Sequence, residues 1–235
     1  MTAIGKVPLV GLAVAVALAV LPTAALATEV EFNKATEDNT HFTVSGGEAV
    51  MILWGVENVI CEKTTGTGEF ALEGGTTKSK TGTINLTLTK CTTQLFGFNC
   101  TTTGQPTGTI QTQNLTFHLV AIEKGKPGIL LTPNDNTGQF AKFTCFSINV
   151  TIVGNGIIGH ITAPACDKNS ASMTIVFNKM GEEEEEEEQS PLTIDEDEET
   201  EYTSEAVVGE EEAGKSIFIN ESTSTLTQGE ALLTC

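Results

Sequence analysis

Six cysteines are the residues whose chemistry is most readily predicted from their spacing. They are Cys61, Cys91, Cys100, Cys145, Cys166 and Cys235. No two of them have the C-x-x-C spacing of zinc sites and no histidine lies near them, so disulfide formation is the favoured chemistry. Cys91 and Cys100 are close enough to close a hairpin loop. We therefore expect the pairs Cys91–Cys100, Cys61–Cys145 and Cys166–Cys235, with no metal and no cofactor.

A dense acidic segment is the second candidate for chemistry, because carboxylates bind hard cations such as calcium. Residues 182–212 hold 17 of the 31 acidic residues and begin with the unbroken run Glu182–Glu188. The later run Asp195–Glu199 lacks the glycine and the alternation of an EF-hand loop. We therefore expect a disordered, solvated loop over residues 181–213 that attracts cations only diffusely.

Nucleophilic catalysis would require a histidine beside a nucleophile and a carboxylate. The three histidines are His41, His118 and His160, and none belongs to a G-x-S-x-G or H-E-x-x-H motif. The carboxylates available for glycoside hydrolysis have no spacing that pairs them; they are Glu48, Glu57, Glu62, Glu69 and Glu123. We therefore predict no catalytic residues, and a hydrolase with a site assembled from distant residues is the alternative.

Composition restricts the classes of partner. The chain has no arginine and a formal net charge of −19, which argues against recognition of nucleic acids. Sugar-binding surfaces usually expose aromatic rings, yet Trp54 and Tyr202 are the only Trp and Tyr in the chain. Because Trp54 ends the apolar run 49–54, we expect it in the core.

The elements that carry these residues are predicted to be β-strands. Apolar and polar residues alternate in many short segments that are separated by glycine-, asparagine- and proline-rich turns. The run 49–54 is continuously apolar and indicates a strand buried on both faces. The alternating segments are 84–88, 115–119, 146–152 and 173–177. This pattern predicts an all-β, disulfide-bonded, antiparallel β-sandwich, with a β-barrel as the alternative.

The N-terminal residues 1–27 are typical of a signal peptide. Lys6 precedes an apolar run over residues 7–21, and Ala25-Leu26-Ala27 provides a cleavage site before Thr28. The expected organisation is a main β domain over residues 28–180, the acidic loop over 181–213, and strands over 214–235 that return to the domain. We expect no membrane span after cleavage; retention of the segment as an anchor is the alternative.

Several short segments carry a resemblance to a known group. They are Ser45–Ala49, the Thr-Gly-Thr-Ile phrases at 81–84 and 107–110, Phe140–Cys145 and Gly156–Thr162. They resemble exported, uncharacterised Thr/Gly-rich all-β proteins of actinobacteria over roughly residues 40–175. The resemblance implies the compartment and the all-β class, and no activity comes with it.

The functional expectation combines these observations. A patterned β body without a catalytic constellation predicts a non-catalytic secreted or cell-envelope protein with a structural or binding role. A secreted hydrolase and a weak calcium-binding protein that uses the acidic loop are the alternatives.

Overall fold

The computed structural model shows an all-β protein. The described residues form 21 strands, and no helix among them has the length and hydropathy to cross a membrane. The described ranges are 30–34, 40–53, 57–74, 76–123, 126–134, 137–177, 192–195, 198–200, 203–209, 211–227 and 229–235. The expected signal peptide, its cleavage site at Ala27 and Thr28, and the run Glu182–Glu188 lie outside these residues.

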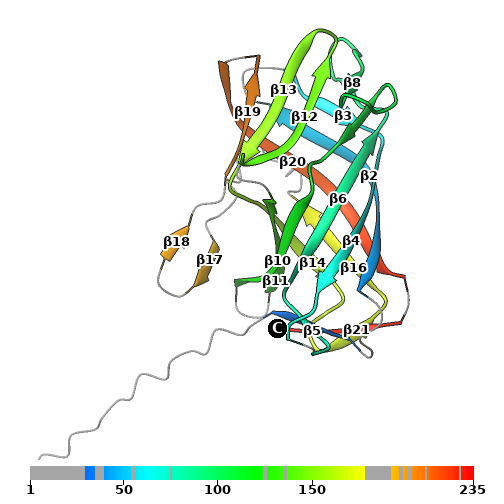
Figure 1. Ribbon diagram of the computed structural model, residues 1–235, viewed down its shortest axis with the longest axis vertical. Coiled ribbons are helices and arrows are strands. Elements are labelled where there is room, and N and C mark those ends of the chain that lie inside the picture. The colour runs from blue at the N-terminus through cyan, green and yellow to red at the C-terminus, as the bar shows by residue number, and fades with distance from the viewer. Residues whose placement is uncertain are drawn as a thin grey trace, which may run out of the picture.

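Eight antiparallel strands close into a β-barrel, so the sandwich expectation is wrong and the alternative is confirmed (Figure 1). In order around the barrel they are β2 (His41–Leu53), β4 (Lys63–Ala71), β6 (Thr81–Thr89), β10 (Leu115–Glu123), β11 (Lys126–Pro133), β14 (Ile157–Ala163), β16 (Ser172–Phe177) and β20 (Glu211–Leu226). Pairing of β20 with β2 closes the ring. Alternation within a strand identifies its buried face, but a sandwich and a barrel share that alternation.

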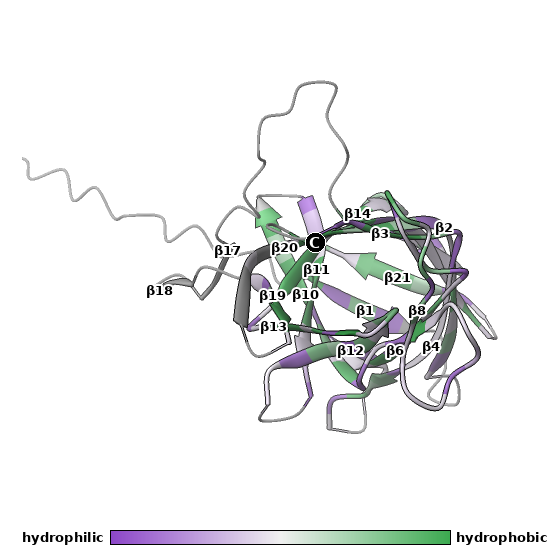
Figure 2. Cartoon of the chain, turned by 90° about the horizontal axis from the view of Figure 1, so that it is seen from above, coloured by the Kyte–Doolittle hydropathy of each residue, from purple (hydrophilic) through white to green (hydrophobic). Residues whose placement is uncertain are grey.

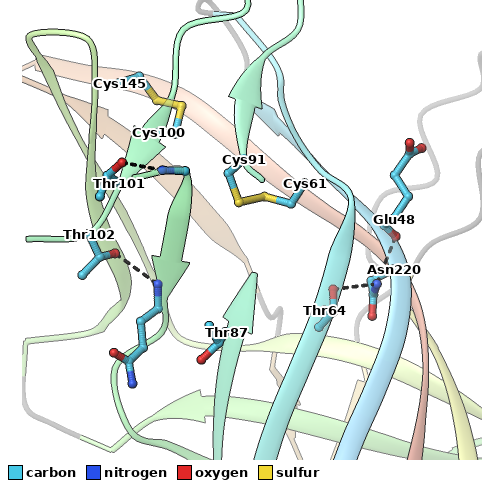
Figure 3. The surroundings of a disulfide bond; sticks show 12 residues. Glu48, Cys61, Thr64, Thr87, Cys91, Cys100, Thr101, Thr102, Cys145 and Asn220 are labelled. Carbon is cyan, nitrogen blue, oxygen red and sulfur yellow. Dashed lines mark hydrogen bonds between the residues drawn. A yellow bond between two sulfur atoms is a disulfide. The ribbon is translucent and has the colours of Figure 1, made fainter. Parts of the chain in front are cut away.

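A bulge in β2 lies where the barrel closes against β20. The register of β2 against β20 shifts between Gly46 and Ala49, which bends the strand. The buried Asn220 side chain holds the bulge: its Nδ2 donates to the Glu48 carbonyl oxygen at 3.1 Å and to Thr64 Oγ1 at 3.1 Å (Figure 3). Asn220 therefore joins the first and the last strand of the barrel to β4.

The barrel interior is packed with side chains from alternating positions. In β6 the buried residues Gly82, Ile84, Leu86 and Leu88 alternate with half-exposed threonines and Asn85, as the sequence predicts. The predicted strands at 115–119 and 173–177 are likewise present in β10 and β16. The apolar run is buried over Ala49–Met51 and at Leu53, which fits a strand covered on both faces; Trp54 lies outside the described residues.

A small sheet covers the end of the barrel near the C-terminus (Figures 1 and 2). It consists of β1 (Glu31–Lys34), β5 (Lys78–Ser79), β15 (Lys168–Ser170) and β21 (Ala231–Thr234). Phe32 of β1 packs against Phe70 with ring centroids 5.2 Å apart, and Leu233 is fully buried. This sheet therefore contributes to the core that fills the barrel.

The opposite end is built by short strands that extend the barrel wall. They are β3 (Val59–Cys61), β7 (Thr92–Thr93), β8 (Cys100–Thr101), β9 (Thr109–Gln111), β12 (Gln139–Cys145), β13 (Ile148–Gly154) and β19 (Ser204–Val208). β12, β13 and β19 continue the sheet from β20, while β3 and β7 continue it from β2. A bridge between Thr92 and Asn99 joins β7 to the residue before β8.

The segment expected to be an acidic loop over 181–213 contains strands. β17 (Leu192–Asp195) pairs with β18 (Glu198–Thr200), and β19 and β20 begin at Ser204 and Glu211. The returning strands therefore begin before the predicted residue 214. β19 pairs with β13 and β20, with Ala206 buried and Glu205 exposed.

Candidate functional site

Three disulfides are present in the structure, and two of the predicted pairings are wrong. The bridges are Cys61–Cys91, Cys100–Cys145 and Cys166–Cys235, of which only the last has the expected partners. The backbones of Cys91 and Cys100 are neighbours, because Cys100 N donates to the Cys91 carbonyl oxygen at 2.9 Å. Their sulfur atoms nevertheless bond to other cysteines, Cys91 to Cys61 and Cys100 to Cys145 (Figure 3). Cys100 lies directly opposite Cys145 in the pairing of β8 with β12. Three bridges are consistent with an oxidising extracellular environment.

The first two bridges hold two adjoining loops at the end of the molecule away from the C-terminus (Figure 1). The loop 92–99 lies between Cys91 and Cys100, and the turn at 146–147 follows Cys145 directly. The two loops contact each other, because the Phe146 N–H donates to the Asn99 carbonyl oxygen at 3.4 Å. From outside the loops, the Glu57 carboxylate accepts hydrogen bonds from Leu95 N and Phe96 N.

These loops carry an exposed apolar surface, which we call the aromatic tip. It consists of Leu95, Phe96, Phe98, Phe146 and Ile148, whose exposed fractions are 80%, 70%, 41%, 74% and 49%. Among the residues whose side chains the structure describes, these five are the exposed large apolar ones, and Ile148 is the first residue of β13, directly after the second loop. Exposed apolar side chains scattered singly are normal, whereas a cluster on one surface indicates a binding site.

The three phenylalanines of the aromatic tip form one stacked row. The rings of Phe96 and Phe98 are 5.7 Å apart with an interplanar angle of 26°, and those of Phe98 and Phe146 are 4.9 Å apart at 23°. Offset stacking of this kind stabilises each ring pair by about 0.5–1.5 kcal/mol beyond burial. The row therefore forms from contacts within the chain, without a partner.

Phe146 has a backbone conformation that favours glycine. Its φ is 58°, at the first position of the two-residue turn between Cys145 and Ile148. A side chain in this left-handed region costs about 1–2 kcal/mol, and such residues are concentrated at functional sites. The sequence pattern placed Phe146 on the core face of a strand over 146–152, which is wrong because β13 begins only at Ile148.

We expect Phe146→Gly to be more stable than Phe146→Ala by about 1 kcal/mol, because glycine relieves the left-handed strain and alanine keeps it. Both variants lose the same ring stacking, so their difference isolates the backbone effect. Urea denaturation of the two variants would measure it. A Phe146→Ala protein as stable as Phe146→Gly would contradict the strain.

A groove of about 490 Å³ lies beside the aromatic tip. Phe98 and Phe146 form part of its wall, and hydroxyl and amide side chains line the remainder. Its polar side chains belong to Asn99, Thr101, Thr102, Thr103, Gln105, Thr107 and Thr144. Segments 94–99, 101–107 and 146–149 contain no charged residue. The groove therefore offers uncharged hydrogen-bonding groups next to exposed rings.

The barrel interior holds a much smaller space. A cavity of about 50 Å³ lies among Met51, Leu86, Ile110, Leu115 and Phe218. Ligand pockets usually measure about 300–1,000 Å³, so this cavity has no room for a ligand of ordinary size. The groove at the aromatic tip is therefore the better candidate site.

The histidines considered for catalysis are spread over the outside of the barrel. His41 Nε2 lies 4.0 Å from Glu69 Oε1 and Thr40 Oγ1 donates to the same oxygen at 2.9 Å, but His41 and Glu69 are both exposed. Because Thr40 donates to the carboxylate and not to His41, the nucleophile–base–acid order of a triad is not formed. Burial lowers the pKa of His118, because it disfavours the charged imidazolium.

The carboxylates considered for glycoside hydrolysis do not gather in one place. Glu57 binds the loop of the aromatic tip, Glu62 forms an ion pair of 2.5 Å with Lys90, and Glu69 lies beside His41. Glu48 contributes its backbone carbonyl to the bulge of β2, and the Glu123 side chain is outside the described part. Among the described residues, no group of three or more His, Cys, Asp or Glu side chains could hold a metal ion.

The exposed rings are three phenylalanines that no sequence pattern singled out, whereas Trp54 and Tyr202 lie outside the described residues. One signal was available. The segment Leu95-Phe96-Gly97-Phe98 is apolar yet lies in a short loop between two cysteines. A glycine inside such a short run favours a turn, and turns lie at the protein surface.

Comparison with known proteins adds no assignment. No family model, curated protein or solved structure matches the chain. The geometry of the aromatic tip and its groove is therefore the basis on which a function is assigned.

Proposed function

We propose that the protein is an exported, non-catalytic binding protein of the extracellular space or cell envelope, and that it contacts its partner through the aromatic tip. One observation carries the proposal: among the residues whose side chains the structure describes, the exposed large apolar ones lie on two adjoining loops or, for Ile148, directly after one of them. Apolar surface left in water costs about 25 cal/mol per Å², so such a cluster is typical of an interaction surface.

The loops are also held in place before binding, which supports the same function. Disulfides begin and end the loop that carries Phe96 and Phe98, and Cys145 precedes Phe146. Phe146 has a backbone conformation that favours glycine, yet the residue there carries an aromatic ring. Such strained residues are concentrated at functional sites. Rigid loops lose little entropy on binding, which raises affinity.

The test compares the full chain with the double variant Phe96→Ser/Phe146→Gly. The probes are suspensions of cellulose, chitin and starch, and vesicles of phosphatidylcholine. A second copy of the chain is tested as a partner by sedimentation, which measures self-association. We expect the wild-type chain to bind one class of probe and the variant to lose at least about fivefold of it.

Thr83→Ala is the matched control for this test. Thr83 lines a groove of about 470 Å³ on the barrel wall, where the neighbouring Phe70 is buried. This variant should bind as the wild type does. Equal binding by the Phe96→Ser/Phe146→Gly variant and the wild type, or no binding to any probe, would overturn the proposal.

A further inference from the structure

We infer that the groove beside the aromatic tip binds a neutral saccharide, with sugar rings against Phe98 and Phe146. This inference rests on the proposed function of the aromatic tip and adds the chemical class of the ligand. The groove measures about 490 Å³, which is room for about two or three pyranose rings.

The lining of the groove matches the chemistry of an uncharged, polyhydroxylated ligand. Neutral sugars present hydroxyl groups at their edges, which form hydrogen bonds with uncharged donors and acceptors of this kind. The side chains of Asn99 and Thr103 are exposed and have no hydrogen-bond partner within the described part of the chain. The Asn99 amide donates through Nδ2 and accepts through Oδ1, so this one side chain can bind two neighbouring hydroxyl groups.

Other polar groups of the groove are held in a fixed orientation. Thr144 Oγ1 donates to Asn149 Oδ1 at 2.9 Å, and the Gln105 amide donates to Gln111 Oε1. Thr144 Oγ1 and Gln105 Oε1 each retain acceptor capacity, and both residues line the groove. Groups oriented in advance give specificity at a small entropic cost.

The exposed rings supply the apolar half of the site. The C–H faces of a pyranose ring pack against aromatic faces, and Phe146 lies at one end of the stacked row, so one of its faces is not covered by another ring of the row. Phe146 is 74% exposed and lines the groove together with Phe98. Rings and hydrogen-bonding groups therefore meet along one wall, as a saccharide requires.

A lipid surface fits the same tip less well. Insertion of Phe96 and Phe146 into a bilayer would bring the exposed Asn99 and Thr103 toward the lipid, where polar groups without partners are costly. The tip segments also lack the lysines and arginines that attract anionic lipids. A saccharide instead satisfies the polar groups and covers the rings.

The test titrates the full chain with cellohexaose, hexa-N-acetylchitohexaose and maltohexaose, all of them uncharged, by isothermal titration calorimetry. We expect at least one of them to bind the wild type. Phe146→Gly should weaken that binding about tenfold, because it removes one ring. Asn99→Ala should weaken it about fivefold through lost hydrogen bonds, while Thr83→Ala should leave it unchanged.

Binding to phosphatidylcholine vesicles and sedimentation of the free chain distinguish failure of the saccharide inference from failure of the proposed function. In one outcome no hexasaccharide gives heat, but the wild type binds vesicles or self-associates and the Phe96→Ser/Phe146→Gly variant does not. This outcome overturns the inference of a saccharide ligand and leaves the proposed function in place. Saccharide binding that both Phe146→Gly and Asn99→Ala retain in full overturns the assignment to this groove. No binding to any of these probes overturns both proposals.

Discussion

Replacing Cys100 and Cys145 together by alanine should lower the free energy of unfolding by about 4 kcal/mol, since the bridge closes a loop of 45 residues. Domains of this kind have about 5–15 kcal/mol of stability, so the loss is a large share of the total. The bridge also ends one loop of the aromatic tip and precedes the other. We therefore expect partner binding to fall at least about tenfold, because both loops lose their attachment.

The Cys166→Ala/Cys235→Ala variant is the control for this experiment. Its bridge closes a loop of 69 residues, so a similar loss of about 4 kcal/mol is expected. This bridge lies at the C-terminal end of the molecule, and its removal should leave binding intact. Urea denaturation and the binding assay, both performed where the variants remain folded, separate the two effects. Equal loss of binding in both variants would show that the tip depends only on global stability.

The second large effect is expected from Gly82 on β6. This residue lies opposite Phe117 in the pairing of β6 with β10. A Cβ atom at Gly82 would lie 2.5 Å from Phe117 Cε1 and would also collide with the Glu69 carbonyl oxygen. Because the second contact is with backbone, the strand itself would have to move. Gly82→Ala should therefore cost about 3 kcal/mol or more.

Gly47→Ala is the matched control for the barrel glycine. Gly47 lies in the bulge of β2, and a Cβ atom there meets nothing within 4 Å. Its free energy of unfolding should stay within about 0.5 kcal/mol of the wild type. A double variant tests the contact itself. Phe117→Leu should lower the free energy of unfolding less in the Gly82→Ala protein than in the wild type, since both changes act on one contact. Additive costs would contradict the packing of Phe117 on Gly82.

Much of the secondary structure follows from neighbouring residues alone. Alternation marks β6, β10 and β16, and the continuous apolar run marks the part of β2 that is buried on both faces. Each of these patterns depends only on the period of a strand, which puts successive side chains on opposite faces. For the same reason the pattern failed at Phe146, where alternation continues into a turn.

The disulfide partners required knowledge of the strand order. Cys91 and Cys100 are the closest pair in sequence, and the structure does place their backbones side by side. Their bridges nevertheless run to β3 and β12, because pairing between distant strands brings Cys61 and Cys145 alongside them. Six cysteines allow 15 pairings, and sequence separation does not rank them.

The candidate site depends on the same long-range arrangement. Phe98 and Phe146 are far apart in the sequence, and a row of rings forms only because β8 pairs with β12. The sequence could indicate an all-β chain with three bridges, because strand periodicity and cysteine number are local or compositional properties. Closure of the barrel and the tip with its groove arise only when β2 meets β20 and β8 meets β12, since these contacts join residues that no local pattern relates.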